Sequence, residues 1–466
     1  MLRWRRVSKP VGMTANSFTA PDRRRFLGAT ATAFAALAAS GCVSRGASTA
    51  AAPRAASSFP GYGALVPDPA SLLDLPQGFS YRVLSKLGAA MDDGGTVPDR
   101  ADGMGCFDIG NGELALVRNH ELQPQHDAGG PIAKGFGKKD GVFVPGGTTT
   151  IVLDAATLSV KRQFRSLGGT IRNCSGGVTP WGTWLTCEEA PIGPGEPRGQ
   201  GLDKSHGWVF EVPASARGLV DAVALTAMGR FNHEAACVDP ASGIVYQTED
   251  RDDSVLYRFL PAVPGKLAQG GRLQAMVIEG LADTRNWDVS DSGRAMPVGK
   301  PYPVRWVDLD DIEAPKDDLR ARAAAKGAAL VARGEGLHMG ENAVFACCTN
   351  GGAKKLGQIL KLTPGLAGAP DTVELFFESQ SIDQFNYGDN LTVAPSGHLF
   401  VCEDQYTDVV DNHIRGITPQ GAAYEFARLT AQTELAGGCF SPDGKWLFVN
   451  AYSPTATLAI TGPWAA

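Results

Sequence analysis

Four short stretches of the chain repeat one plan, in which a turn with Pro and Gly is followed by a short, mostly apolar run that ends on a polar residue. They read PWGTWLTCEE (180–189), PASGIVYQTED (240–250), PSGHLFVCED (395–404) and PDGKWLFVN (442–450). The polar residue six places after the Gly is Glu188, Glu249, Glu403 or Asn450. Gly and Pro favour the turn, and β-branched and aromatic residues favour the strand. One turn-and-strand unit is therefore used repeatedly.

The unit recurs along most of the chain. Less regular copies follow Gly112 and Gly340, which brings the number of units to six. Repetition of a strand unit with variable insertions is typical of a β-propeller. The sequence therefore predicts an all-β fold, a six-bladed β-propeller with one helical insertion at residues 314–334, where helix-start and helix-end signals occur. A β-sandwich or two separate β-domains is the alternative.

The first 42 residues carry the features of an export signal. Three arginines at 23–25 precede Phe-Leu and an Ala-rich segment too short to span a bilayer, which predicts a twin-arginine signal. Cys42 ends AASGC, which resembles a lipoprotein processing site, so lipid attachment and simple cleavage are both open. We expect residues 43–65 to be a flexible tether and 66–466 to be a single propeller domain. The predicted location is the periplasm, with membrane contact only through a lipid on Cys42.

The charge of the chain indicates which partners it can bind. The net charge is −6 at neutral pH, although the first 42 residues hold seven Lys and Arg against one Asp. The remainder is therefore more acidic than the whole, which disfavours nucleic acid as a partner and favours metal cations. A closed propeller leaves no sheet edge that requires a partner, so we expect a monomer.

Eight cysteines follow Cys42, and an even number in an exported protein would allow disulfides. Most of them stand inside apolar, strand-like runs such as WLTCEE, FACCTN and LFVCED. A buried free thiol is the ordinary state of Cys in such runs, so we expect mainly free, buried thiols. Cys174 is a separate case, because it stands six residues before the turn Pro180.

Other residues that precede the turns are also candidates for metal binding. Six places before the turn Pro, the other regular units hold Glu234 and Asp389, and the less regular units offer Asp102, Glu335 and Glu434. The first strand of a propeller blade lines the central channel, so these side chains are expected to meet at its mouth. A thiolate and several carboxylates in one place repel one another unless cations neutralise them. Carboxylates suit Ca²⁺, Mg²⁺ or ferric iron, and a lone thiolate favours iron or zinc. We interpret the repeated acids at the strand ends, Glu188, Glu249 and Glu403, in the same way, as a consequence of a metal site at the channel mouth.

The motif Asn-His-Glu occurs twice, in RNHEL (118–122) and FNHEA (231–235). It is not the zinc-binding HExxH helix, because Cys237 takes the place of the second His. A buried, hydrogen-bonded His at the end of a strand is one interpretation. The two glutamates, Glu121 and Glu234, instead favour a metal site, because isolated buried acids are costly.

From about Val83 to Tyr452 the sequence resembles the PhoX-type alkaline phosphatases, a family of exported bacterial phosphomonoesterases. The resemblance is carried by VRNHE, NCSGGVTPWGTWLTCEE, FNHEAACVDPASGIVYQTEDR, RGEG, GDNLTVAPSGHLFVCED and GGCFSPDGKWLFVN. It implies a six-bladed propeller with a cluster of Fe³⁺ and Ca²⁺ at the channel mouth that cleaves phosphate monoesters.

The resemblance also implies roles for single residues. Cys174 corresponds to the thiolate ligand of iron, and Glu234, Glu335 and Asp389 correspond to carboxylate ligands. With Glu121 from the Asn-His-Glu motif and Glu434 from the channel pattern, these residues form the predicted metal-binding set.

Two further residues are predicted to act in catalysis. Arg333 corresponds to an arginine that holds phosphate, and Asn119 lies in the Asn-His-Glu motif. The family usually has Arg-Pro-Glu-Trp where this chain has Arg-Gly-Glu-Gly. No matching position identifies the lysine that often assists phosphate binding, for which the candidates are Lys134, Lys138 and Lys139.

We therefore expect a metal-dependent phosphatase that acts on small phosphate monoesters without a serine nucleophile, with Ser175 as a turn residue. Two alternatives stay open. One is a Ca²⁺-dependent lactonase or esterase on a propeller, which would hold one metal without the cysteine. The other is a non-catalytic propeller that keeps the acids as a structural calcium site.

Overall fold

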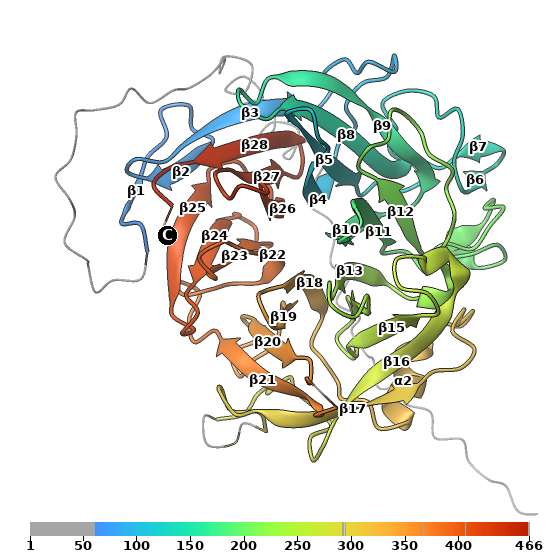
Figure 1. Ribbon diagram of the computed structural model, residues 1–466, viewed down its shortest axis with the longest axis vertical. Helices are drawn as coiled ribbons and strands as arrows, with labels where there is room; N and C mark the ends of the chain where they lie inside the picture. Colours follow the sequence, from blue (N-terminus) through green and yellow to red (C-terminus); the bar gives the residue numbers. More distant parts are fainter. Residues whose placement is uncertain (1–60, 291–292, 294, 367, 406, 465–466) are drawn as a thin grey trace, which may run out of the picture.

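The computed structural model describes residues 61–290, 293, 295–366, 368–405 and 407–464. The predicted export signal, Cys42 and most of the predicted tether lie outside the described residues. The regular secondary structure of the described chain is almost entirely β-strand, and its sheets stand side by side around a central axis (Figure 1). The predicted all-β, propeller-like architecture is confirmed.

Two sheets that come early in the chain contain four strands and three strands. The first contains β4 (Ala101–Asp108), β5 (Glu113–His120), β8 (Gly146–Asp154) and β9 (Val160–Thr170). The second contains β10 (Asn173–Val178), β11 (Thr183–Glu188) and β12 (Val209–Pro213). A separate hairpin of β6 (Lys138–Lys139) and β7 (Val142–Phe143) stands between β5 and β8 in the chain.

The next sheet has nine strands. These are β13 (His233–Val238), β14 (Val245–Glu249), β15 (Tyr257–Pro261), β16 (Gly271–Ile278), β17 (Tyr302–Asp308), β21 (Asp371–Glu378), β20 (Gln358–Thr363), β19 (Val344–Cys348) and β18 (Gly334–Met339). The sheets thus differ from six separate blades. The physical reason is β17, which pairs with β16 on one side and with β21 on the other and so joins two four-stranded units.

The last two sheets combine strands from both ends of the described chain. One contains β22 (Gly388–Val393), β23 (Leu399–Glu403), β24 (His413–Ile417), β25 (Ala423–Leu429), β2 (Leu73–Pro76) and β1 (Leu65–Val66). The other contains β26 (Leu435–Phe440), β27 (Leu447–Ala451), β28 (Ala456–Thr461) and β3 (Ser80–Lys86). Because β3 pairs with β28, the two ends of the chain close the ring. Tyr62, within the predicted tether, packs edge-on against Phe79 and Trp464.

Six strands lie innermost and surround the axis. They are β4, β10, β13, β18, β22 and β26, and each contacts the next, with β26 in contact with β4. Apolar layers fill the spaces between neighbouring sheets, as where Phe107 and Val117 pack with Trp184 and Phe210. Burial of one such side chain contributes roughly 1.5–3 kcal/mol. These layers hold the innermost strands in fixed positions relative to one another.

The helical insertion is shorter than predicted. α2 spans Leu319–Ala325 and not residues 314–334. The chain leaves the helix at Gly327, whose φ of +94° is left-handed, and Gly334 already begins β18. Three short 3₁₀ turns also occur, η1 (Pro197–Gly199), η2 (Thr226–Met228) and η3 (Leu267–Gln269). None of the helices in the described residues is long and apolar enough to cross a membrane.

All eight described cysteines are free thiols. Seven of them are buried and Cys106 is half-buried. The prediction of mainly free, buried thiols is confirmed.

Candidate metal centre

Each innermost strand has a β-bulge near its beginning. The register with the second strand shifts after Ala101, Asn173, His233, Gly334, Gly388 and Ala436. A bulge adds an unpaired residue and re-aims its side chain. In five strands the residue that follows is an acid or a thiol, namely Asp102, Cys174, Glu234, Glu335 or Asp389, and in β26 it is Gly437. The bulges therefore set the positions of the predicted ligands.

The acids and the thiol form three groups, two of which share a residue. The first contains Glu121, Cys174 and Glu189, the second Glu234, Glu335 and Asp389, and the third Asp389, Asp404 and Glu434. Within each group the ligand atoms lie within 4.8 Å of one another, and Asp389 belongs to two groups. Asp102 adjoins the first group, because the Cys174 Sγ donates to its Oδ2 at 3.5 Å. All six residues predicted to bind metal are thus brought together.

The electrostatics of these acids fit a site for cations. Burial, followed by like-charged neighbours, raises the pKa of Asp102, Glu234 and Glu434. Burial raises the pKa of Glu189 and of Asp389 to about 8. Burial and neighbouring carboxylates likewise raise the pKa of the Cys174 thiol. The charged forms of these acids and of the thiol therefore need a bound cation, because the positive charges of the protein itself do not offset their burial and mutual repulsion.

Two buried oxygens show the same need. Asp102 Oδ1 and Glu234 Oε1 have no hydrogen-bond partner among the described residues. A buried polar atom without a partner is costly, and a cation would satisfy both. Several carboxylates with one thiolate are a donor set that suits a hard cation such as Ca²⁺ together with iron. The residues present therefore fit the implied metals.

The acids six places after each turn Gly have a different function from the one expected. Glu188 accepts hydrogen bonds from the backbone N–H of Ile171 and of Gly207, both at 2.8 Å. Glu249 accepts from the Tyr257 hydroxyl at 2.6 Å, and Glu403 accepts from Arg415 Nε at 2.9 Å. These acids hold their own sheets together. The prediction that they repeat because of a metal site is wrong.

The next residue in each unit is the one that reaches the cluster. Side chains alternate along a strand, so the residue after Glu188, Glu249 or Glu403 faces the other way. These residues are Glu189, Asp250 and Asp404. None of these three acids was predicted as a ligand from the sequence. The signal was present as the second acid of each pair, in CEE, TED and CED.

Three arginines stand two residues before the bulged residues of their strands. Arg100, Arg172 and Arg333 all have left-handed backbone conformations, with φ of 57°, 51° and 42°. Such conformations cost free energy in a non-glycine residue and persist where the surroundings impose them. Arg333 donates from Nε to Asp250 at 2.6 Å and from Nη2 to Glu335 at 2.9 Å. The sequence analysis identified only Arg333 of the three.

Arg172 and Arg100 lie on the other side of the cluster. Arg172 Nε donates to Glu121 Oε1 at 2.7 Å, and its Nη2 pairs closely with Glu189. Arg100 donates to the Tyr452 hydroxyl at 2.9 Å, and that hydroxyl donates to Glu121. The cluster thus contains guanidinium groups as well as carboxylates.

Asn119 does not face the carboxylates. Its Nδ2 donates to the backbone oxygens of Cys174 (2.9 Å) and Ser175 (2.7 Å), and its Oδ1 accepts from Trp184 Nε1 at 2.9 Å. Both amide hydrogens are therefore used by β10, and none is left to donate to a phosphate. Asn119 therefore holds the bulge of Cys174, and its part in catalysis stays a prediction.

The histidines of the two Asn-His-Glu motifs are buried in the protein interior. His120 Nδ1 pairs with the Asp99 carbonyl, and His233 Nε2 with the Gly229 carbonyl at 3.0 Å. Burial lowers the pKa of His233 to about 3, so its ring is neutral. The interpretation of these residues as hydrogen-bonded strand-end histidines is confirmed. Among the candidate lysines, Lys134 pairs with Asp221 on the surface.

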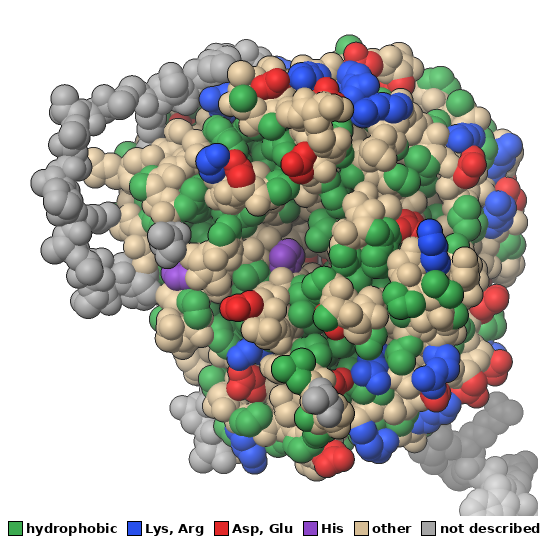
Figure 2. Space-filling view, in the orientation of Figure 1, with side chains coloured by type: hydrophobic (Ala, Val, Ile, Leu, Met, Phe, Trp, Pro, Cys, Tyr) green, Lys and Arg blue, Asp and Glu red, His purple; other side chains and the backbone are tan. Residues whose placement is uncertain are grey.

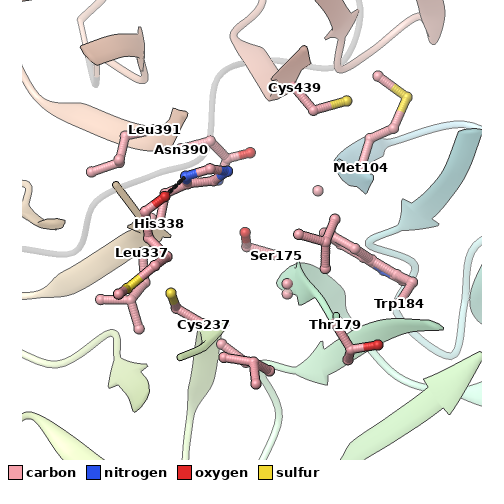
Figure 3. A pocket seen from close by; sticks show the side chains of 18 of the residues that line it. Met104, Ser175, Thr179, Trp184, Cys237, Leu337, His338, Asn390, Leu391 and Cys439 are labelled. Atoms are coloured by element: carbon pink, nitrogen blue, oxygen red, sulfur yellow. Dashed lines mark hydrogen bonds between the residues drawn. The ribbon is translucent and has the colours of Figure 1, made fainter. Parts of the chain in front are cut away.

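A cavity of about 320 Å³ occupies the part of the channel beyond the bulges (Figure 3). Figure 2 shows a hollow near the centre of the ring in the view of Figure 1. The cavity is lined mainly by apolar groups and thiols, among them Met104, Cys237, Leu337 and Cys439. Ser175 also lines this cavity, and it lies within β10 and not in a turn as predicted. The phosphate chemistry predicted from the sequence does not fit this cavity.

The fold and the site together define a class of protein, a β-propeller with a buried cluster of acids, one thiol and arginines at the start of its innermost strands. The sequence model of the family described as alkaline phosphatase PhoX matches residues 60–157 and 147–455. The chain therefore belongs to the alkaline phosphatase PhoX family.

A solved structure from the same family shares this fold. Pseudomonas fluorescens PhoX in complex with vanadate, a transition state analogue, is 19% identical, with 84% of this chain and 96% of that chain covered and a TM-score of 0.66. A gluconolactonase from Xanthomonas campestris is 13% identical over 87% of this chain and 99% of that chain, with a TM-score of 0.40. Comparison with curated proteins found no match.

Proposed function

We propose that this protein hydrolyses phosphate monoesters at the buried acid and thiol cluster, with iron and calcium as its cations. The observation that carries the proposal is the convergence of Glu234, Glu335 and Asp389 from three strands, beside Arg333 and close enough to Cys174 of a fourth strand for Glu234 to act on its thiol. Membership of the PhoX family and the vanadate bound by the Pseudomonas fluorescens protein support it.

The residues that would hold the cations form two sets that differ in their ligand atoms. Cys174 with Glu121 and Glu189 is the set suited to iron, because a thiolate is the softest ligand present. The carboxylates of Glu234, Glu335, Asp389, Asp404 and Glu434 are suited to calcium. Bound cations would supply Lewis acidity and offset the charge of the phosphate oxygens.

Arg333 is proposed to bind two oxygens of the phosphate group. A planar guanidinium is suited to paired oxygens, and such bonds strengthen as negative charge develops during reaction. Asp250 and Glu335 hold the guanidinium in place at 2.6 and 2.9 Å. A serine nucleophile is not required, because Ser175 lines the apolar cavity.

Other features of the proposal concern the whole chain. We count the ring as six blades, one for each innermost strand, with β17 as a bridge between two of them. We further propose export by the twin-arginine route to the periplasm, cleavage or lipid attachment at Cys42, and a monomeric propeller from residue 66 onwards. Small phosphate esters are the proposed partners, and no nucleic acid is expected.

The test combines metal analysis with an activity assay. The purified full chain is analysed for iron and calcium and then given p-nitrophenyl phosphate with and without a chelator. We expect both metals and a turnover that the chelator abolishes and added cations restore. Calcium without iron would favour the lactonase or the non-catalytic alternative, and both metals without turnover would overturn the phosphatase.

A further inference from the structure

A second cavity, of about 480 Å³, lies beside the cluster between the loops before β4 and after β5. Its buried surfaces are apolar and include Val97 and Leu122. Its exposed rim is polar and includes Thr96, Gln125 and Asp127. The cavity is therefore amphipathic and open to solvent.

Hydrogen bonds hold the two loops in place. The Thr96 N–H donates to the Gly129 carbonyl at 2.7 Å, and the Gly129 N–H donates to Asp127 Oδ1 at 2.9 Å. A Cβ at Gly129 would lie 2.2 Å from the Thr96 oxygen, so only glycine permits this approach. The cavity is thus formed before any ligand arrives, which reduces the ordering cost of binding.

Arg100 joins this cavity to the cluster. It lines the cavity, and its carbonyl accepts from the Glu121 N–H at 2.9 Å. Its side chain donates one hydrogen bond, to Tyr452, and makes no ion pair with any described residue. A guanidinium has five N–H donors, so Arg100 has donors to offer a ligand in the cavity.

We propose that this cavity binds the leaving alcohol of the phosphate ester, and that the alcohol is a polyhydroxylated one of about the size of a sugar. This inference rests on the proposed phosphatase function. Arg100 and Gln125 donate hydrogen bonds, Asp127 accepts them, and Val97 and Leu122 provide an apolar surface for ring C–H groups.

Other classes of alcohol fit the cavity less well. Asp99 and Asp127 also line it and would repel an anionic leaving group. An alkyl or aromatic alcohol would displace water from the polar rim without replacing its hydrogen bonds. Sugar hydroxyls both donate and accept, so they match a rim that contains both kinds of group.

The test compares two esters of similar size on the cation-loaded full chain, glucose 6-phosphate and cyclohexylmethyl phosphate. The readout is the ratio of their kcat/KM values. We expect the wild type to favour glucose 6-phosphate by at least about tenfold, the value of one or two hydrogen bonds to a charged donor. Arg100→Met should reduce this ratio by about tenfold and Gln125→Ala by about threefold. Arg217→Met, which removes an exposed arginine, is the matched control and should leave the ratio unchanged.

A second readout does not depend on turnover. Saturation-transfer NMR on the same proteins, with D-glucose as the probe, should show transfer to the sugar ring that Arg100→Met weakens and Arg217→Met does not. A wild-type ratio near one, or a ratio that Arg100→Met does not change, would overturn the inference while p-nitrophenyl phosphate is still hydrolysed. Hydrolysis of none of the three esters would overturn the proposed function and the inference with it.

Discussion

Cys174 and Arg333 are the two residues whose environments say most about the chemistry. The Cys174 thiol lies among four carboxylates, Asp102, Glu121, Glu189 and Glu234, that act on its ionisation. An isolated thiol in such surroundings would stay protonated, because the neighbouring charges oppose a thiolate. A cation reverses that preference, since a coordinating thiol is deprotonated. Cys174 is therefore expected to be a ligand rather than a nucleophile.

Replacement of Cys174 by Ala should remove iron and activity. The carboxylates of the other groups remain, so the variant should still bind calcium. Metal analysis and the p-nitrophenyl phosphate assay are the measurements. Cys187→Ala is the matched control, because Cys187 is a buried thiol in an apolar cluster. Iron retained by Cys174→Ala, or lost from both variants, would show that Cys174 has no specific part in iron binding.

Replacement of Arg333 by Ala should spare the metals and weaken the handling of phosphate. We expect kcat/KM to fall by about 10²–10³-fold, as when one donor to a developing charge is removed. Inorganic phosphate should also inhibit the variant less. Lys in place of Arg333 should restore only part of the loss, because its ammonium group cannot bind two oxygens side by side. Loss of iron or calcium from Arg333→Ala would indicate a structural role instead.

At the scale of the elements, the β-bulges of the innermost strands are the feature that positions the candidate ligands. They require the innermost strands to approach one another closely at their starts. Gly336 follows the bulged Glu335, and a Cβ there would lie 2.5 Å from the Leu391 N and 2.6 Å from the Asp389 oxygen. The contact lies between two backbones, so it cannot be relieved by rotation of a side chain.

Gly336→Ala should therefore disturb the cluster and the stability together. Overpacking of this kind costs roughly 1–3 kcal/mol of unfolding free energy. The added methyl separates β18 from β22, so calcium affinity should fall as well. Gly218→Ala is the control, because a Cβ there meets nothing within 4 Å. Thermal unfolding and calcium titration are the measurements, and a Gly336→Ala protein that matches the control in both would contradict this account.

At the scale of the whole molecule, the affinity for cations should rise with pH, whereas the stability of the cation-free protein should fall. Burial raises the folded-state pKa of Glu189 and Asp389 to about 8, well above the roughly 4 of an unfolded carboxyl. The stability that their protonation contributes is present at pH values below about 4 and is lost as the pH rises through 8. Cations compete with these protons, so their affinity rises over the same range.

The cation-free protein should thus unfold at a lower temperature at pH 9 than at pH 6, and calcium should raise that temperature more at pH 9. Scanning calorimetry with and without calcium at both pH values is the measurement. Glu189→Gln should weaken both trends, and an exposed control, Glu341→Gln, should leave them unchanged. A calcium effect that does not increase with pH would contradict the role given to Glu189 and Asp389.

Much of the architecture followed from local sequence. The turn-and-strand unit fixes short strands wherever Pro and Gly precede β-favouring residues, so an all-β ring could be predicted without long-range information. The free thiols followed in the same way from their apolar runs. The residues at the starts of the innermost strands were also found, because equivalent positions in repeated units meet near the axis.

Other features depended on contacts between distant segments. The pairing of β17 with both β16 and β21 joins two units through an insertion whose sequence does not specify either partner. Glu189 and not Glu188 belongs to the cluster, because which of two adjacent acids faces the channel depends on strand register and not on residue type. The hydrogen bonds from the Asn119 amide to β10 likewise depend on contact between distant strands. Composition and periodicity determined where the strands form. The tertiary structure decided which side chains share a site, because side chains far apart in sequence are brought together only by the pairing and bulging of strands.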